Sequence, residues 1–123
     1  MKKHSFGIRN FGSYSENPYK QAYLESGDNK DQVITINKRH LIKLLSLSRT
    51  SLKLLGYLMY MHEEGSEIVY FNLRACRSQT GFKDKRSIYN ALTELLGEQI
   101  IARTKNENIY YLNAGIIITS ERA

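Results

Sequence analysis

The clearest hydrophobic pattern in the chain lies between residues 84 and 97. Four apolar residues recur there at i, i+4, i+7 and i+8, the spacing of a helix that packs one face on a core. They are Ile88, Leu92, Leu95 and Leu96. Asp84 is a residue type that caps helix N-termini, and Gly97 is one that ends helices. The pattern therefore predicts a helix that begins after Asp84 and stops at Gly97.

Two earlier segments show helical spacing as well. Residues 38–47, KRHLIKLLSL, follow Asn37 as a candidate cap, and Ser48 is the candidate cap of a second helix that Gly65 is expected to end. The inward residues expected are Leu41, Leu44 and Leu45 in the first segment and Leu52, Leu55, Leu58 and Met59 in the second. Both segments are predicted to be core helices.

Short strands are predicted where residues alternate or are β-branched. Residues 32–37 (QVITIN) alternate, and residues 68–71 (IVYF) are β-branched and aromatic. Residues 99–104 (QIIART) and 108–113 (NIYYLN) are apolar runs joined by a polar tip, which is typical of a β-hairpin.

One more short helix is expected before the 84–97 pattern. Asn72 caps NLRACRSQT, Leu73 and Cys76 face inward, and Thr80 and Gly81 break the helix. The order of helices, strand, helix, tight turn, helix and hairpin is that of a winged helix-turn-helix. The expected fold is α+β and mainly helical, a winged helix-turn-helix with a C-terminal β-hairpin wing.

In that arrangement the helix after the tight turn enters the DNA major groove. With its apolar stripe turned inward, the opposite face carries Arg86, Asn90 and Thr93, with Ser87 and Tyr89 on the flanks. Arginine pairs with guanine and asparagine with adenine, while hydroxyl groups suit phosphates. These residue types predict contact with duplex DNA.

Composition limits the domain organisation. The chain has 123 residues, 41% of them hydrophobic and none of them Trp, which suits one domain with a modest core. Residues 1–31 are rich in Ser, Asn, Gly, Tyr and Lys and show no periodicity, so we expect a flexible N-terminal arm. The winged helix-turn-helix domain is expected over 32–123.

Positive charge is concentrated in two segments. The net charge is +6; residues 38–53 hold five cations and no acid, and residues 72–86 hold five cations and one acid. This segregation predicts one basic face and a polyanionic partner. The candidate DNA-binding residues are Lys83, Lys85, Arg86, Ser87, Tyr89, Asn90, Thr93, Arg74, Arg77, Lys105 and Asn106.

Each candidate also has a structural interpretation. The cations near residue 84 could be a solvated face, although cations oppose the dipole of a helix N-terminus there. Lys105 and Asn106 could form an ordinary turn, and Arg74 or Arg77 could pair with a carboxylate of the acidic segment 62–67 instead of a phosphate. Tyr57, Tyr60 and Tyr70 are expected to be partly buried or to lie at an interface.

Catalytic chemistry finds little support. The one cysteine, Cys76, excludes an intramolecular disulfide and is expected to be a small core residue. His4, His40 and His62 do not have metal-ligand spacing, and no P-loop or GxGxxG is present. We expect no enzyme activity, no cofactor, no membrane span and a cytoplasmic location.

The run TGFKDKRSIYNALTELLGEQIIARTKNENIYYLNAGIII, residues 80–118, resembles the winged-helix region of plasmid and phage replication initiators of the RepL type. The shared pattern is a TG corner, a Ser/Thr-[VI]-x-x-[AT]-[LI] helix, a G-x-I-I-[AK]-R strand and a Tyr-x-[ILM]-Asn close. Upstream, VITINKRHLIKLLSLSRTSLKLLGYLM resembles the start of such chains, so the resemblance covers about 33–122. It implies a recognition helix over 85–96 and a wing over 101–112. The chain departs from the family at Asn113-Ala114, commonly Asn-Pro, and at Ser120-Glu121-Arg122, often Gly-Asp-Arg.

The function expected is sequence-specific binding of double-stranded DNA, as a plasmid or phage replication initiator at origin repeats that recruits host replication proteins. A winged-helix transcriptional regulator would use the same contacts. A winged-helix module that binds protein would not need the charge around residue 84. A homodimer is expected, with the apolar residues of 41–60 as material for its interface.

Overall fold

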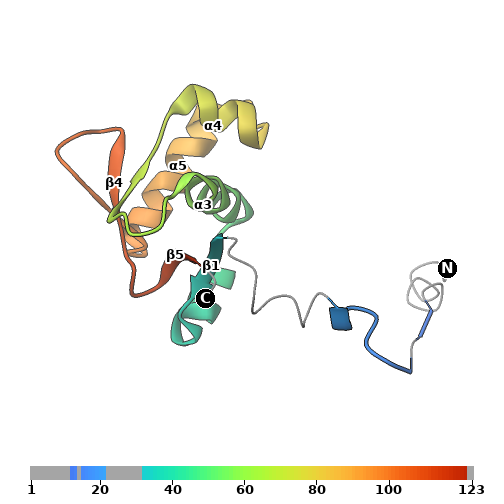
Figure 1. The fold of residues 1–123 in the computed structure, drawn as a ribbon. Helices are drawn as coiled ribbons and strands as arrows, with labels where there is room; N and C mark the ends of the chain where they lie inside the picture. Colours follow the sequence, from blue (N-terminus) through green and yellow to red (C-terminus); the bar gives the residue numbers. More distant parts are fainter. Residues whose placement is uncertain (1–11, 14, 22–31, 122–123) are drawn as a thin grey trace. The chain divides into compact units, whose positions relative to one another are not determined.

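The structure, a computed structural model, describes residues 12–13, 15–21 and 32–121 (Figure 1). Residues 32–121 belong to one compact unit and residues 12–13 and 15–21 to another, so each is described by itself. In the second unit the chain turns at Asn17, whose carbonyl accepts from the Lys20 N–H at 3.1 Å. Residues 1–11, 14 and 22–31 of the predicted arm lie outside the described residues.

The unit of residues 32–121 is an α+β fold. Within 32–121 it contains four α-helices, one 3₁₀ helix and two small antiparallel sheets. The elements are β1 (Gln32–Ile36), η2 (Lys38–His40), α2 (Leu41–Leu45), α3 (Arg49–Met61), β2 (Ile68–Tyr70), α4 (Leu73–Thr80), α5 (Lys85–Gly97), β3 (Ile101–Arg103), β4 (Ile109–Leu112) and β5 (Ile117–Glu121). The predicted strands and hairpin and the later helices are present, residues 38–47 form only a 3₁₀ turn and a five-residue helix, and β5 is a strand that the periodicity did not predict.

Strand pairing joins segments that are distant in sequence. The three-stranded sheet has the order β2-β4-β3. Strand β4 of the hairpin therefore pairs with β3 on one edge and with β2 on the other. The two-stranded sheet pairs β1 with β5, from Gln32 opposite Glu121 to Ile36 opposite Ile117. The β2–β4 and β1–β5 pairings therefore join segments that are far apart in the sequence.

Side-chain caps fix where the helices begin, as predicted. The Ser48 Oγ accepts from the Ser51 N–H at 3.1 Å, the Asn72 Oδ1 from the Ala75 N–H at 2.8 Å, and the Asp84 Oδ1 from the Arg86 N–H at 2.9 Å. Each contact satisfies an amide that has no partner within its own helix. Gly81 follows α4 with φ of 79°, a left-handed conformation that glycine adopts at little cost.

The core lies between α3, α5 and the inner face of the three-stranded sheet (Figure 1). The predicted inward residues of α5 are confirmed, since Ile88, Leu92 and Leu95 are buried and Leu96 packs against them partly buried. Leu54 and Leu58 of α3 face them and are fully buried. This packing fixes which face of α5 is left for solvent.

The expectation of two core helices was wrong for the first. Residues 38–45 form a 3₁₀ turn and a helix of only five residues, in which Leu44 alone is buried. Leu41 and Leu45 are exposed because the short helix has no element to cover a full stripe. In α3 the prediction missed Leu54 and included Leu52, which is 37% exposed.

Two predicted helix ends also differ. Helix α3 ends at Met61, before Gly65, because His62 takes an extended backbone and its ring bonds to the Thr119 hydroxyl and the Ser66 carbonyl, both at 2.8 Å. Helix α5 includes Gly97, and the chain reverses at Gln99, which has φ of 61°. The Asn113 side-chain amide donates to the Gln99 carbonyl at 2.9 Å and stabilises that reversal.

Glu94 connects α5 to the beginning of α3. Its carboxylate accepts from the Ser51 hydroxyl and, at 3.3 and 3.4 Å, from the Ser48 N–H. Hydrogen bonding by Ser51 first, and then by Ser48, holds the pKa of Glu94 below its ordinary value. The negative charge also lies at the positive end of the α3 dipole.

Glu94→Gln is expected to lower the free energy of unfolding by roughly 0.5–1 kcal/mol at pH 7, a modest loss because the group is near solvent. A carboxyl whose pKa is lower in the folded state stabilises the fold above its ordinary pKa of 4.5 and loses this effect as pH falls through the folded value. Urea unfolding at pH 7 and pH 3 should show the difference between the two proteins shrinking in acid. Glu98→Gln, at the exposed end of the same helix, is the control; an equal Glu94→Gln loss at both pH values would contradict the charge argument.

Candidate nucleic-acid interface

The face of α5 opposite its buried stripe is exposed. Arg86, Asn90 and Thr93 reach solvent there, with Ser87 half-buried and Tyr89 47% exposed on the flanks. The Thr93 hydroxyl donates to the Tyr89 carbonyl at 2.9 Å. The strip therefore presents a guanidinium and a side-chain amide as free recognition groups, about one helical turn apart.

The turn that precedes α5 gathers positive charge. Lys83 and Lys85 are exposed on either side of the capping residue, and the Arg77 guanidinium of α4 donates to the Lys83 carbonyl at 2.7 Å. The Lys53 ammonium of α3 lies 5.2 Å from the centre of the Phe82 ring, within the range of a cation–π contact. Arg77 thus braces the turn, while Lys53 adds a cation that was not among the candidate site residues.

The hairpin adds a further cation on the side of α5. Arg103 of β3 is opposite Tyr110 of β4. On the other side of β4, Tyr110 is opposite Val69 of β2, which is buried. Burial and the nearby Tyr89 hydroxyl raise the pKa of Tyr110, while the Arg103 charge acts in the opposite direction. Arg103 of β3 and Tyr89 of α5 therefore both lie near Tyr110. The candidate residues did not include it because it stands on the strand and not at the hairpin tip.

The hairpin tip is held by its own polar groups. The Thr104 hydroxyl donates to the carbonyls of Asn106 and Ile109, and the Asn106 Oδ1 accepts from the Asn108 N–H at 2.8 Å. The Asn106 side chain is thus engaged in forming the turn. Lys105 is exposed and remains available to a ligand.

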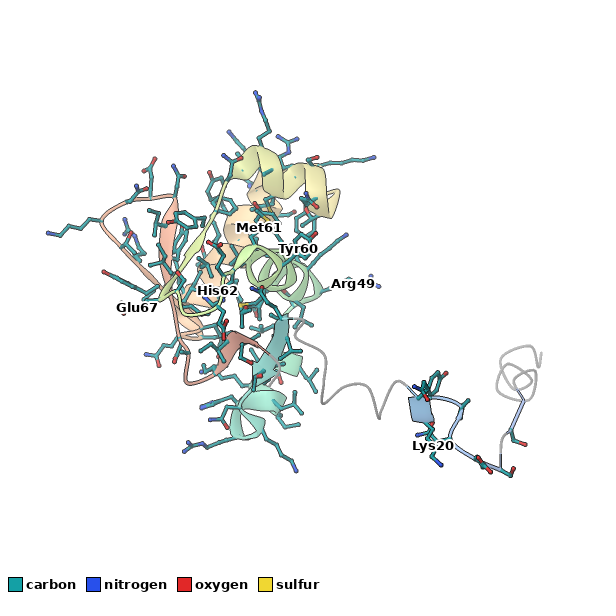
Figure 2. The ribbon with its side chains drawn as sticks, in the orientation of Figure 1. Lys20, Arg49, Tyr60, Met61, His62 and Glu67 are labelled. Atoms are coloured by element: carbon teal, nitrogen blue, oxygen red, sulfur yellow. The ribbon has the colours of Figure 1, made fainter. Side chains whose placement is uncertain are left out.

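The two basic segments do not form one face. The turquoise helices η2 and α2, with Lys38, Arg39 and Lys43, lie at the end of the unit opposite α4, and nitrogen-tipped side chains project from both ends (Figures 1 and 2). From the first basic segment, Lys53 contacts the turn before α5. Six of the predicted DNA-contact residues lie on α5, while Arg74 is exposed on α4 and Lys105 and Asn106 lie at the hairpin tip.

No group of three His, Cys, Asp or Glu side chains could hold a metal ion among the described residues, and no described helix is long and apolar enough to cross a membrane. Cys76 is fully buried, as predicted for a core residue, and burial raises the pKa of its thiol. His62 is buried too: the Ser66 carbonyl can only accept, so Nε2 carries a proton there. His4 lies outside the described residues.

No protein-family model, curated protein or solved structure matches the chain.

Proposed function

We propose that this protein binds double-stranded DNA in a sequence-specific manner through a winged helix-turn-helix. In this proposal α3, α4 and α5 are the three helices, α5 is the recognition helix, and the β3–β4 hairpin is the wing. Arg86 and Asn90 read base edges in the major groove, while Lys83, Lys85 and Arg103 contact phosphates.

The observation that carries the proposal is the two-sided character of α5. One face is fully committed to the core by Ile88, Leu92 and Leu95, so the helix is held rigidly. The other face offers Arg86 and Asn90 beside a cationic N-terminus and a hairpin that bears further cations. Positive charge at a helix N-terminus costs some helix stability, and a phosphate backbone bound there offsets that cost.

The finer role that we propose is initiation of plasmid or phage replication, with host replication proteins as partners. It rests on the resemblance of residues 80–118 to RepL-type initiators. A transcriptional regulator would use the same interface, and a protein-binding winged helix is the alternative from another class.

Selection of bound sequences from a random duplex library, followed by salt titration of the winner against random DNA, tests the proposal. We expect one enriched motif and a large affinity gap between that motif and random duplex at physiological salt. No enrichment, with only weak binding that is steeply dependent on salt, would reduce the interaction to general electrostatics. That result would favour the protein-binding module.

Arg103→Ala is expected to weaken binding to selected and random duplexes alike. The charge is lost from a strand beside α5, so the slope of log affinity against log salt should fall by about one. Fluorescence anisotropy over a salt series measures both quantities. Arg39→Ala removes an exposed cation at the opposite end of the unit and should change neither; an equal effect of the two substitutions would contradict the assignment.

A further inference from the structure

An apolar groove lies on the side of α3 that faces away from α5. Its volume is about 390 Å³, and it is lined by Ile34, Leu52, Leu55, Gly56, Met59, Tyr60 and Ile117. The lining comes from α3, β1 and β5, and no charged residue belongs to it. Ile34 and Leu52 are 45% and 37% exposed, although both are large apolar side chains. The groove is therefore an uncharged, partly exposed surface, in contrast to the basic character of the whole chain, whose net charge is +6.

Gly56 is unusual at its position in the groove. It lies in the interior of α3, where glycine is about 1 kcal/mol less favourable than alanine. A Cβ built on it would meet no atom within 4 Å, and its φ is not positive, so the fold itself does not require glycine there. An exposed, costly glycine that lines an apolar groove permits close approach of another backbone or side chain.

Tyr60 is the complementary feature. It is 78% exposed, projects from α3 (Figure 2), and lies one helical turn after Gly56 on the same face. The groove therefore has a projecting aromatic ring and a small-residue gap side by side on one helix. A surface with both features is complementary to a copy of itself that is turned end for end.

The charges on α3 favour the same arrangement. Arg49 and Lys53 both precede Gly56 and lie in the N-terminal half of the helix. In a parallel pairing these cations of two copies would face each other, whereas an antiparallel crossing near residues 56–60 keeps them apart. A two-fold axis perpendicular to the helix generates the antiparallel crossing.

We propose that this groove binds a second copy of the chain, with the two α3 helices crossing antiparallel near Gly56 and the Tyr60 ring of each copy covering the other's Gly56. The surface lies about 140° around α3 from Ser51, which contacts α5. Self-association thus leaves the exposed strip of α5 open, and it does not depend on whether that strip binds DNA.

Sedimentation equilibrium of the full chain without DNA tests this proposal. We expect a monomer–dimer equilibrium that Tyr60→Ser and Gly56→Ala each weaken at least tenfold. Tyr70→Ser is the matched control, because Tyr70 is 58% exposed on β2 outside the groove and its loss should leave the equilibrium within twofold.

Gly56→Ala separates an interface from a folding role. Alanine favours the helix and meets no neighbour. The free energy of unfolding of the monomer, measured at a dilution where no dimer forms, should therefore rise, while the affinity of the dimer falls. A chain that stays monomeric at millimolar concentration would overturn the proposal. So would a dimer that neither groove substitution affects, because the contact would then lie elsewhere. Since DNA is absent from the measurement, neither result bears on the proposed function.

Discussion

Ile88→Ala is expected to lower the free energy of unfolding by about 2–5 kcal/mol, the usual range for truncating a fully buried aliphatic side chain. Ile88 has no exposed surface and is the first residue of the inward stripe of α5. Truncation of the Ile88 side chain leaves a cavity beneath the first helical turn of α5, which carries Arg86. Against a typical total stability of about 5–15 kcal/mol, this is a large share.

Chemical denaturation measures the loss for Ile88→Ala, with Thr93→Ala on the exposed face as the control, expected to stay within about 0.5 kcal/mol. Hydrogen exchange should show α5 amides losing protection in the first variant only. A loss below about 1 kcal/mol for Ile88→Ala would mean that this side chain does not hold the helix, and the inference of a rigid recognition face would fail with it.

Arg86→Ala is expected to cost about 1–3 kcal/mol of binding free energy on the selected duplex and to relax base preference at one position. The Arg86 side chain is exposed, while its backbone N–H is held by the Asp84 cap. The substitution therefore removes the guanidinium without changing the start of the helix. Repeating the library selection with the variant shows which position loses its preference.

Lys83→Ala provides the comparison for that result. Lys83 is exposed before the cap, so its loss should weaken all duplexes alike and lower the salt slope by about one. If Arg86→Ala weakened selected and random DNA by the same factor, Arg86 would be a phosphate contact and its base-reading role would be wrong.

Local signals in the sequence predicted α5 and the capped helix starts well. The stripe from Ile88 to Leu96 is narrow, so one face was clearly inward, and the side chains of Ser48 and Asp84 can cap only a helix that begins directly after them. Helix α3 was harder, because its apolar residues cover most of its circumference. Spacing alone could not choose Leu54 over Leu52, and contact with α5 decides it.

Long-range pairing could not be predicted from local pattern. Strand β5 was missed because its partner β1 lies over 80 residues earlier, and neither strand has a turn to set the register. Arg103 was also missed, because its position opposite Tyr110 depends on the register of β3 and β4. Lys53 was counted as charge, but its contact with Phe82 needs the packing of α3 on the turn.

The pairing of β1 with β5 has a consequence for how the folded unit can be rearranged. Because Gln32 is opposite Glu121, the first and last described residues of the 32–121 unit are neighbours across one sheet. A short linker could join them into a closed ring, and the ring could be opened at the exposed turn of Gly65 without cutting a helix or a strand. The unit is therefore suited to circular permutation, with β1 and β5 becoming a covalent hairpin.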